Sequence, residues 1–255
     1  MKTYFRAEML KYRHTSMKGL AVGMPLITVF LAAWLTHQFF AVDSYNWWYI
    51  GMYPGFLGIL CGLIGGKDKR KKNHTIWSLP CAMEKIWDGK ILVGAVISGV
   101  SVICVTVFTI LAGELMESIL HIQYLAKPSI GAQILAGVLM WLTTLWEIPF
   151  CLFLSQKMST FLMLVIHVGL YAVLAAAVSL TSWFALVPGA ITARLMCPVL
   201  GVLPNGLIAQ PGSMTYSAQM TEMGSLFLGI PAALLWFGVL WWGSRKWFGR
   251  QVASK

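Results

Sequence analysis

The stretch ILVGAVISGVSVICVTVFTILAG, residues 91–113, decides the fold class because it runs for 23 residues without a charged side chain. An α-helix rises 1.5 Å per residue, so about 20 apolar residues cross the roughly 30 Å hydrocarbon core of a bilayer. Windows of similar length and composition occur at 19–36, 47–66, 131–154, 160–180 and 225–243. Glu147 is the only charged residue in all of these windows. The sequence predicts an all-α integral membrane protein whose six transmembrane helices form one domain over residues 1–255.

The composition of the whole chain agrees with a membrane protein. Hydrophobic residues make up 58% of the chain and charged residues only 11%, whereas soluble domains carry about 25% charged residues. The formal net charge is nevertheless +10. Such an excess fits nucleic acid, anionic lipid or membrane topology, and the positions of the charges distinguish these explanations.

The basic residues are concentrated in alternate segments between the predicted spans. All but two of the 19 Lys and Arg residues lie in the N-terminal arm, the loop 67–90, the turn at Lys157 and the C-terminal tail. The exceptions are Lys127 and Arg194. By the positive-inside rule these four segments, and with them both termini, are cytoplasmic. The excess charge is therefore explained by orientation, and no nucleic-acid partner is expected.

The N-terminal arm, residues 3–18, has apolar side chains at helical spacing. Phe5, Met9 and Tyr12 share one side, and cations such as Arg6 lie on another. This pattern predicts a helix in the cytoplasmic membrane interface that contacts lipid headgroups. A frayed cytosolic arm is the alternative.

The loop 67–90 combines a run of cations with an apolar segment. Residues 75–90 read TIWSLPCAMEKIWDGK, and Pro80 suits the first turn of a helix, where its missing N–H does no harm. A helix from Pro80 would place Met83, Ile86 and Trp87 on one side. Such a face fits either the membrane surface or a groove in a cytoplasmic subunit, and composition does not choose between them.

The segment 181–224 is apolar but rich in proline, with Pro188, Pro198, Pro204 and Pro211. Proline at this frequency prevents a full spanning helix. We therefore expect short helices at the outer membrane face, or re-entering the membrane, before the last span.

Glu147 lies inside a predicted span, where an unpaired carboxylate is costly. It shares a polar stripe of its helix with Thr144, and Pro149 predicts a kink nearby. Glu147 precedes Lys157 by ten residues and His167 follows it by ten, so a hairpin turning there brings the two side chains to equal depth. We predict a hydrogen bond between them. A neutral His167 bonded to a nearby backbone or hydroxyl group is the alternative.

Motifs for catalysis and cofactor binding are absent from the sequence. There is no G-x-x-x-x-G-K-[ST] phosphate loop, no H-E-x-x-H and no G-x-S-x-G, and the five histidines are scattered. We therefore expect no metal site, no bound cofactor and no catalytic residue on this chain.

The order of these parts resembles the permease subunit of a type-2 ABC exporter, and it is most similar to the permeases of lantibiotic-immunity and lantibiotic-resistance transporters. The residues that carry the resemblance are Thr75–Lys90, followed directly by the third span. The resemblance implies that 67–90 is a coupling loop docked on a separate ATPase subunit. The implied contacts are Ile76, Trp77, Ser78, Leu79, Pro80, Met83, Glu84, Ile86 and Trp87.

The resemblance also implies partners, a cargo and a location. Two ATPase chains would hold ATP and Mg, and a second permease chain, of a different but related sequence, would complete the complex in a bacterial cytoplasmic membrane. The cargo would be a cationic amphipathic antimicrobial peptide, expelled from the membrane. Acids on the predicted outer side are candidate contacts for it: Asp43, Glu114, Glu117 and Glu222.

Two other functional classes remain open from the residues themselves. One is a polytopic membrane enzyme with Glu147 and His167 as its polar centre. The other is a membrane anchor or sensor that recruits a cytoplasmic partner through residues 75–87.

Overall fold

The protein, described here by a computed structural model, is placed over residues 1–70, 73–77 and 81–251, and this part contains no β-strand. Its helices are α1 (Lys2–Lys11), α2 (Met17–Thr36), η1 (His37–Phe39), α3 (Phe40–Trp47), η2 (Trp48–Met52), α4 (Tyr53–Lys69), α5 (His74–Trp77), α6 (Met83–Leu120), α7 (Ile130–Thr144), α8 (Glu147–Lys157), α9 (Thr160–Ala177), η3 (Phe184–Leu186), α10 (Pro188–Leu200), η4 (Ala218–Thr221) and α11 (Gly224–Arg250).

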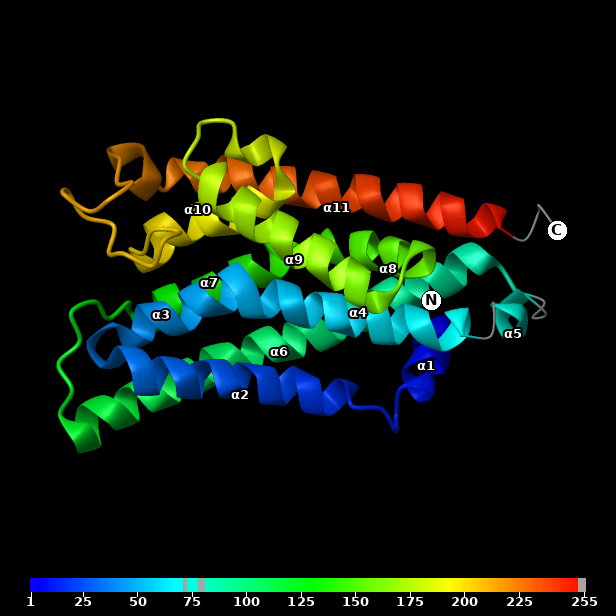
Figure 1. Cartoon of the computed structure of the whole chain (residues 1–255), viewed down its shortest axis with the longest axis horizontal. Helices are drawn as coiled ribbons and strands as arrows, with labels where there is room; N and C mark the ends of the chain where they lie inside the picture. Colours follow the sequence, from blue (N-terminus) through cyan, green and yellow to red (C-terminus); the bar gives the residue numbers. More distant parts are fainter. Residues whose placement is uncertain (71–72, 78–80, 252–255) are drawn as a thin grey trace.

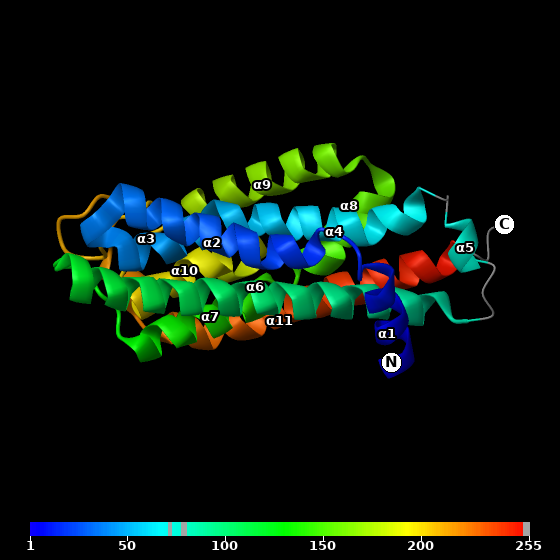
Figure 2. The same ribbon diagram turned by 90° about the horizontal axis from the view of Figure 1, so that it is seen from below.

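The long helices lie roughly along one axis and form an elongated bundle (Figure 1). α1, α5 and the last turns of α11 lie at one end of this bundle, and the loop between α6 and α7 lies at the other (Figures 1 and 2).

Four helical stretches of the described chain are long and apolar enough to cross a membrane: Met17–Lys69, Met83–Leu120, Thr160–Ala177 and Gly224–Arg250. The bent pair α7 and α8 is a fifth if it forms a single span. The all-α membrane class is therefore confirmed, while by these criteria the count is four or five, against six expected from the sequence.

The stretch Met17–Lys69 folds back on itself. The chain turns at η1, where His37 has a positive φ of 37°. The hydroxyl of Tyr12, just before α2, donates to the Ile64 carbonyl near the end of α4, at 2.9 Å. The beginning of α2 and the end of α4 are thus neighbours, and the two helices run antiparallel (Figures 1 and 2).

Large apolar side chains remain exposed on the outside of the bundle. Phe227 of α11 is 85% exposed, Phe161 of α9 is 77% exposed and Ile103 of α6 is 64% exposed. A soluble protein rarely exposes so much contiguous apolar surface. These faces are those expected to meet lipid.

The N-terminal helix is shorter than predicted. It ends at Lys11 rather than at residue 18, and a separate turn leads to α2 at Met17. α1 lies crosswise to the bundle at its end (Figure 2) and contacts α6. Glu8, which the sequence places among the polar residues of this helix, is buried.

The third span extends far beyond the predicted 91–113. α6 is one helix of 38 residues because no proline occurs between Pro80 and Pro128. Its first turns include Met83, Ile86 and Trp87, which the sequence assigned to a separate short helix. Its last turns extend to Leu120, seven residues beyond the end of the predicted span and past Glu114 and Glu117, which the sequence places on the outer side of the membrane.

The predicted kink near Glu147 is present. α7 and α8 meet at an angle of 41° across a break at Leu145 and Trp146. Pro149 has no N–H to donate to the Leu145 carbonyl one turn earlier, which removes a hydrogen bond where the helix bends.

The proline-rich segment contains the short helices that the sequence predicts. In α10 every residue except Pro188 and Pro198 is buried, and the helix contacts α7, α9 and α11. A short helix at membrane depth is tolerated where protein encloses it. α10 is therefore part of the protein core rather than a surface loop.

Candidate functional site

Glu147 and His167 form a hydrogen bond inside the bundle. The imidazole Nε2 of His167 lies 2.8 Å from the carboxylate Oε2 of Glu147. The two residues are 0% and 1% exposed. Glu147 is the first residue of α8 and His167 lies in α9, so the bond joins the two arms of the hairpin that turns after Lys157. The predicted pairing is confirmed.

Aromatic rings enclose the imidazole of His167. The ring centroids of Phe150, Trp146 and Tyr171 lie 6.0, 6.3 and 6.3 Å from it. The other carboxylate oxygen of Glu147 has no hydrogen-bond partner among the residues that the structure describes. If one proton is shared between the carboxylate of Glu147 and Nε2 of His167, the buried pair has no net charge.

Thr144 does not join the Glu147 and His167 pair. Its hydroxyl donates to the Met140 carbonyl at 2.7 Å, one turn back in its own helix. The polar stripe of the sequence therefore does not form one hydrogen-bonded group, because a threonine in a helix readily donates to a carbonyl of its own backbone.

At the end of the bundle that holds α1 and α5, a group of four charged side chains joins α1, α4 and α6. We call Glu8, Lys11, Asp68 and Lys90 the ionic cluster. Lys11 lies 2.6 Å from Glu8 and 3.2 Å from Asp68, and Lys90 lies 3.3 Å from Glu8 and also contacts Asp68. Lys90 is only 1% exposed. The cluster contains two cations and two anions, so its formal charges cancel.

Sequence reasoning missed the ionic cluster. The sequence places Lys90 at the end of the basic loop 67–90, but the side chain is buried. The only local signal is that Glu8 and Tyr12 are four residues apart on the side of α1 that meets the bundle, where the Tyr12 hydroxyl donates to Glu8 at 3.2 Å. The partners on α4 and α6 are distant in sequence and no local pattern identifies them.

The apolar face of Met83, Ile86 and Trp87 is not exposed, which corrects the expectation that it projects toward a partner. All three residues are buried. The ring of Trp87 stacks on Phe248 of α11 at 4.6 Å, and its indole N–H donates to the Ser244 hydroxyl at 2.9 Å. The aromatic end of α11 thus covers Trp87 within the same chain.

Glu84 is also engaged within the chain. It lies 3.2 Å from both Arg245 and Lys246 of α11. One turn further along α6, Asp88 lies 3.0 Å from Arg245. Together with the Trp87 contact, these ion pairs bind the first turns of α6 to the last turns of α11.

The remaining part of the predicted coupling segment lies around α5. Ile76 is buried and Trp77 is partly buried, while His74, Ala82 and Lys85 are exposed. Ser78, Leu79 and Pro80 are outside the described residues. Among the described residues of this segment, the exposed side chains are therefore His74 on α5, Ala82 before α6 and Lys85 in the first turn of α6.

The four acids predicted to face the outside do not form one site. Glu114 and Glu117 share Lys127, which lies 2.8 Å from Glu114 and also contacts Glu117. Asp43 is half-buried on α3, and Glu222 is exposed before α11. Within the described structure no ion pair links Asp43 or Glu222 to the other two. The pairing with Lys127 leaves the Glu114 and Glu117 group a formal charge of −1.

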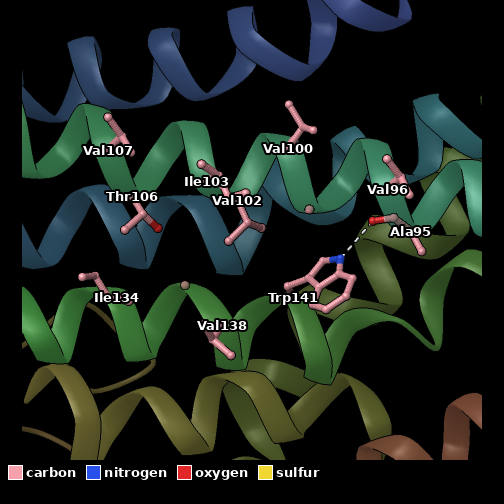
Figure 3. A pocket seen from close by; sticks show the side chains of 12 residues that line it. Ala95, Val96, Val100, Val102, Ile103, Thr106, Val107, Ile134, Val138 and Trp141 are labelled. Atoms are coloured by element: carbon pink, nitrogen blue, oxygen red, sulfur yellow. Dashed lines mark hydrogen bonds between the residues drawn. The ribbon is translucent and has the colours of Figure 1, made fainter.

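A groove of about 550 Å³ runs between α6 and α7 (Figure 3). Its walls are almost wholly apolar, with Val100, Ile103 and Val107 on one side and Ile134 and Val138 on the other. Trp141 lies at one end, where its indole N–H donates to the Ala95 carbonyl at 3.0 Å. Such a groove can hold an apolar chain or side chains but offers almost no polar contact.

The described residues contain no group of three or more His, Cys, Asp or Glu side chains that could hold a metal ion. Comparison with models of protein families, with curated proteins and with solved structures found no match. Functional assignment therefore depends on the residues and the geometry described above.

Proposed function

We propose that this chain is the membrane permease subunit of an ATP-driven exporter of the type-2 ABC class, which expels a cationic amphipathic antimicrobial peptide and so confers immunity or resistance. It would lie in a bacterial cytoplasmic membrane with both termini cytoplasmic. In this proposal the chain crosses six times: α2 and α4 are two antiparallel crossings, the bent pair α7 and α8 is one, and α6, α9 and α11 are one each.

The observation that best supports the proposal is the continuity of α6. A helix of 38 residues is about 57 Å long at 1.5 Å per residue. It begins beside the segment proposed to meet the ATPase and ends beyond Glu114 and Glu117. A displacement at Met83 would therefore reach the other side of the membrane without passing a joint. The ion pairs of Glu84 and Asp88 with Arg245 would couple the movement of α11 to that of α6.

ATP and Mg would be held by two partner ATPase chains, because this sequence has no phosphate-binding loop. A second permease chain, different but related, would complete the transmembrane part. For the peptide, the groove between α6 and α7 fits the apolar side of an amphipathic molecule. Glu114, Glu117, Asp43 and Glu222 remain the candidate contacts for its cationic side.

The test is the capture of companions from membranes that express the full chain with its neighbouring genes. Affinity purification in detergent should recover an ATPase chain. Changing Trp77 to Glu should lower its recovery at least tenfold, because a buried charge at a protein interface is not tolerated. Leu10→Glu is the matched control, since Leu10 is 66% exposed on α1 at the same end of the bundle. An ATPase recovered equally with both variants, at unchanged peptide resistance, would refute the coupling assignment.

A membrane enzyme is the second candidate, and the hydrogen bond between Glu147 and His167 is the observation that favours it. An enzyme should act on lipid or peptide when the chain alone is placed in liposomes. Its activity should disappear in Glu147→Gln, which preserves the hydrogen-bonding oxygen but removes the acid. Activity that requires added ATPase subunits would favour the exporter.

A further inference from the structure

A second pocket, of about 420 Å³, lies where the ends of α4 and α8 meet the start of α9. Its lining includes the cations Lys69 and Arg70 and the hydroxyl groups of Ser159 and Thr160, together with the apolar side chains of Ile59 and Leu63. It is separate from the groove of Figure 3.

The lining of this pocket carries two cations and no carboxylate. The ammonium of Lys69 donates to the carbonyls of Ser155 and Met158, at 2.8 and 2.7 Å. These two bonds hold the ammonium in place at the end of α8, where carbonyl dipoles favour a cation. Arg70 is exposed and makes no ion pair with any residue that the structure describes. Asp68, the nearest acid in sequence, is occupied by Lys11 and Lys90.

The change from apolar to polar follows the axis of α4. Ile59 and Arg70 are 11 residues apart, which is about 16 Å along a helix. The cationic end belongs to the end of the bundle that holds α1 and α5, directly after the predicted crossing 47–66. A molecule that fills the pocket would therefore need a negative group at the membrane surface and an apolar part that extends into the hydrocarbon.

Space for such a molecule comes from Gly66, which also lines the pocket. A Cβ atom placed on Gly66 would meet no atom within 4 Å. The hydroxyl groups of Ser159 and Thr160 at the beginning of α9 can donate hydrogen bonds to an anionic oxygen. Cations, hydroxyl donors and an adjoining apolar wall together match a phosphate ester with attached acyl chains.

We propose that this pocket binds the phosphate headgroup of one anionic phospholipid from the cytoplasmic leaflet, with an acyl chain along Ile59 and Leu63. The bound lipid would connect the ends of α4, α8 and α9. The inference requires only that the chain is embedded in a membrane, and it does not depend on an ATPase or on a peptide cargo.

The test uses the purified full chain in detergent, equilibrated with mixed micelles of phosphatidylglycerol and phosphatidylcholine, and analysed by native mass spectrometry. We expect the chain to retain one phosphatidylglycerol with about a tenfold preference over phosphatidylcholine. Arg70→Gln should lower that preference about fivefold, which is the contribution of one cation near a membrane surface. Arg70 is exposed and makes no ion pair with any described residue, so this variant is expected to test the site without disturbing the bundle.

Two further variants separate a pocket from general surface charge. Gly66→Val fills the open space and should abolish retention, whereas Lys85→Gln removes an exposed cation from the same end of the bundle and should leave it unchanged. Equal losses in Arg70→Gln and Lys85→Gln, or an undiminished preference in Arg70→Gln, would overturn the proposal. A final arm adds 10 mM glycerol 3-phosphate as a probe. Displacement of the lipid by it would show that the site takes a free phosphate ester instead.

Discussion

At the residue scale, Lys90 is the side chain whose role differs most from its sequence context. The sequence places it in the basic segment 67–90, yet in the structure it lies on α6, is 1% exposed and contacts both acids of the ionic cluster. The same cluster gathers residues from α1, α4 and α6 that are up to 82 positions apart. Buried charges remain in place only when they are paired.

Replacing Lys90 by Met should therefore destabilise the protein. Glu8 and Asp68 would be left with Lys11 alone, and removing one partner from a buried ion pair costs about 3–5 kcal/mol. Thermal unfolding in detergent measures the effect. Lys246→Met is the control, because Lys246 is 46% exposed and surface pairs contribute about 0–1 kcal/mol. Equal shifts for the two variants would contradict a buried ionic cluster.

Lys11 makes the same cluster sensitive to alkaline pH. Burial opposes the charge of Lys11, but hydrogen bonding and charge from Glu8 and Asp68 raise the pKa above its ordinary value of 10.5. A raised pKa gives stability that is complete below pH 10.5 and is lost as the pH rises through the folded-state pKa. The difference in unfolding temperature between the wild type and Lys11→Gln should be constant from pH 8 to about pH 10 and should shrink above that. A difference that grows with pH would contradict this sign.

At the scale of elements, α4 approaches its neighbours closely because it is rich in glycine. A Cβ atom on Gly62 would lie 2.3 Å from Cγ2 of Thr160 in α9. Gly55, on the same helix, has open space where its Cβ would be. Small residues allow such close contact between helices in membranes.

Gly62→Ala should therefore lower the free energy of unfolding by about 1–3 kcal/mol, the usual cost of overpacking. Gly55→Ala should leave it unchanged or raise it by up to about 1 kcal/mol, because alanine favours a helix. Unfolding in detergent, monitored by circular dichroism, compares the two. If both variants are equally stable, α4 and α9 are not in close contact.

Elements also show where local sequence was sufficient. The bend between α7 and α8 follows from Pro149, and the equal distances of Glu147 and His167 from Lys157 predict the equal depth that their hydrogen bond requires. The extent of α6 could have been read from the absence of proline between Pro80 and Pro128. What no periodicity could show is that Trp87 of α6 stacks on Phe248 of α11, because that contact joins residues about 160 positions apart.

At the scale of the whole molecule, the proposed topology places Met214 outside and Lys246 inside the cell. Met214 is 74% exposed in the segment between α10 and α11, and Lys246 is in the last turns of α11. The five native cysteines are free, so they are first replaced by serine or alanine. A single Met214→Cys should then react with an impermeant maleimide on whole cells, whereas Lys246→Cys should react only after the cells are opened. If both cysteines react from the same side, the chain does not cross the membrane an odd number of times between them. If only Lys246→Cys reacts on whole cells, the proposed orientation is wrong.

The sequence by itself determined the membrane class and the approximate positions of the apolar helices, and it predicts a common side for the two termini. These properties depend on local composition and on how charges are distributed along the chain. Tertiary structure decided which side of each helix is buried, that Lys90 joins the ionic cluster and that Glu114 and Glu117 share Lys127. The reason is physical: hydropathy specifies that a helix lies in the membrane, but its rotation and partners depend on contacts with helices distant in sequence.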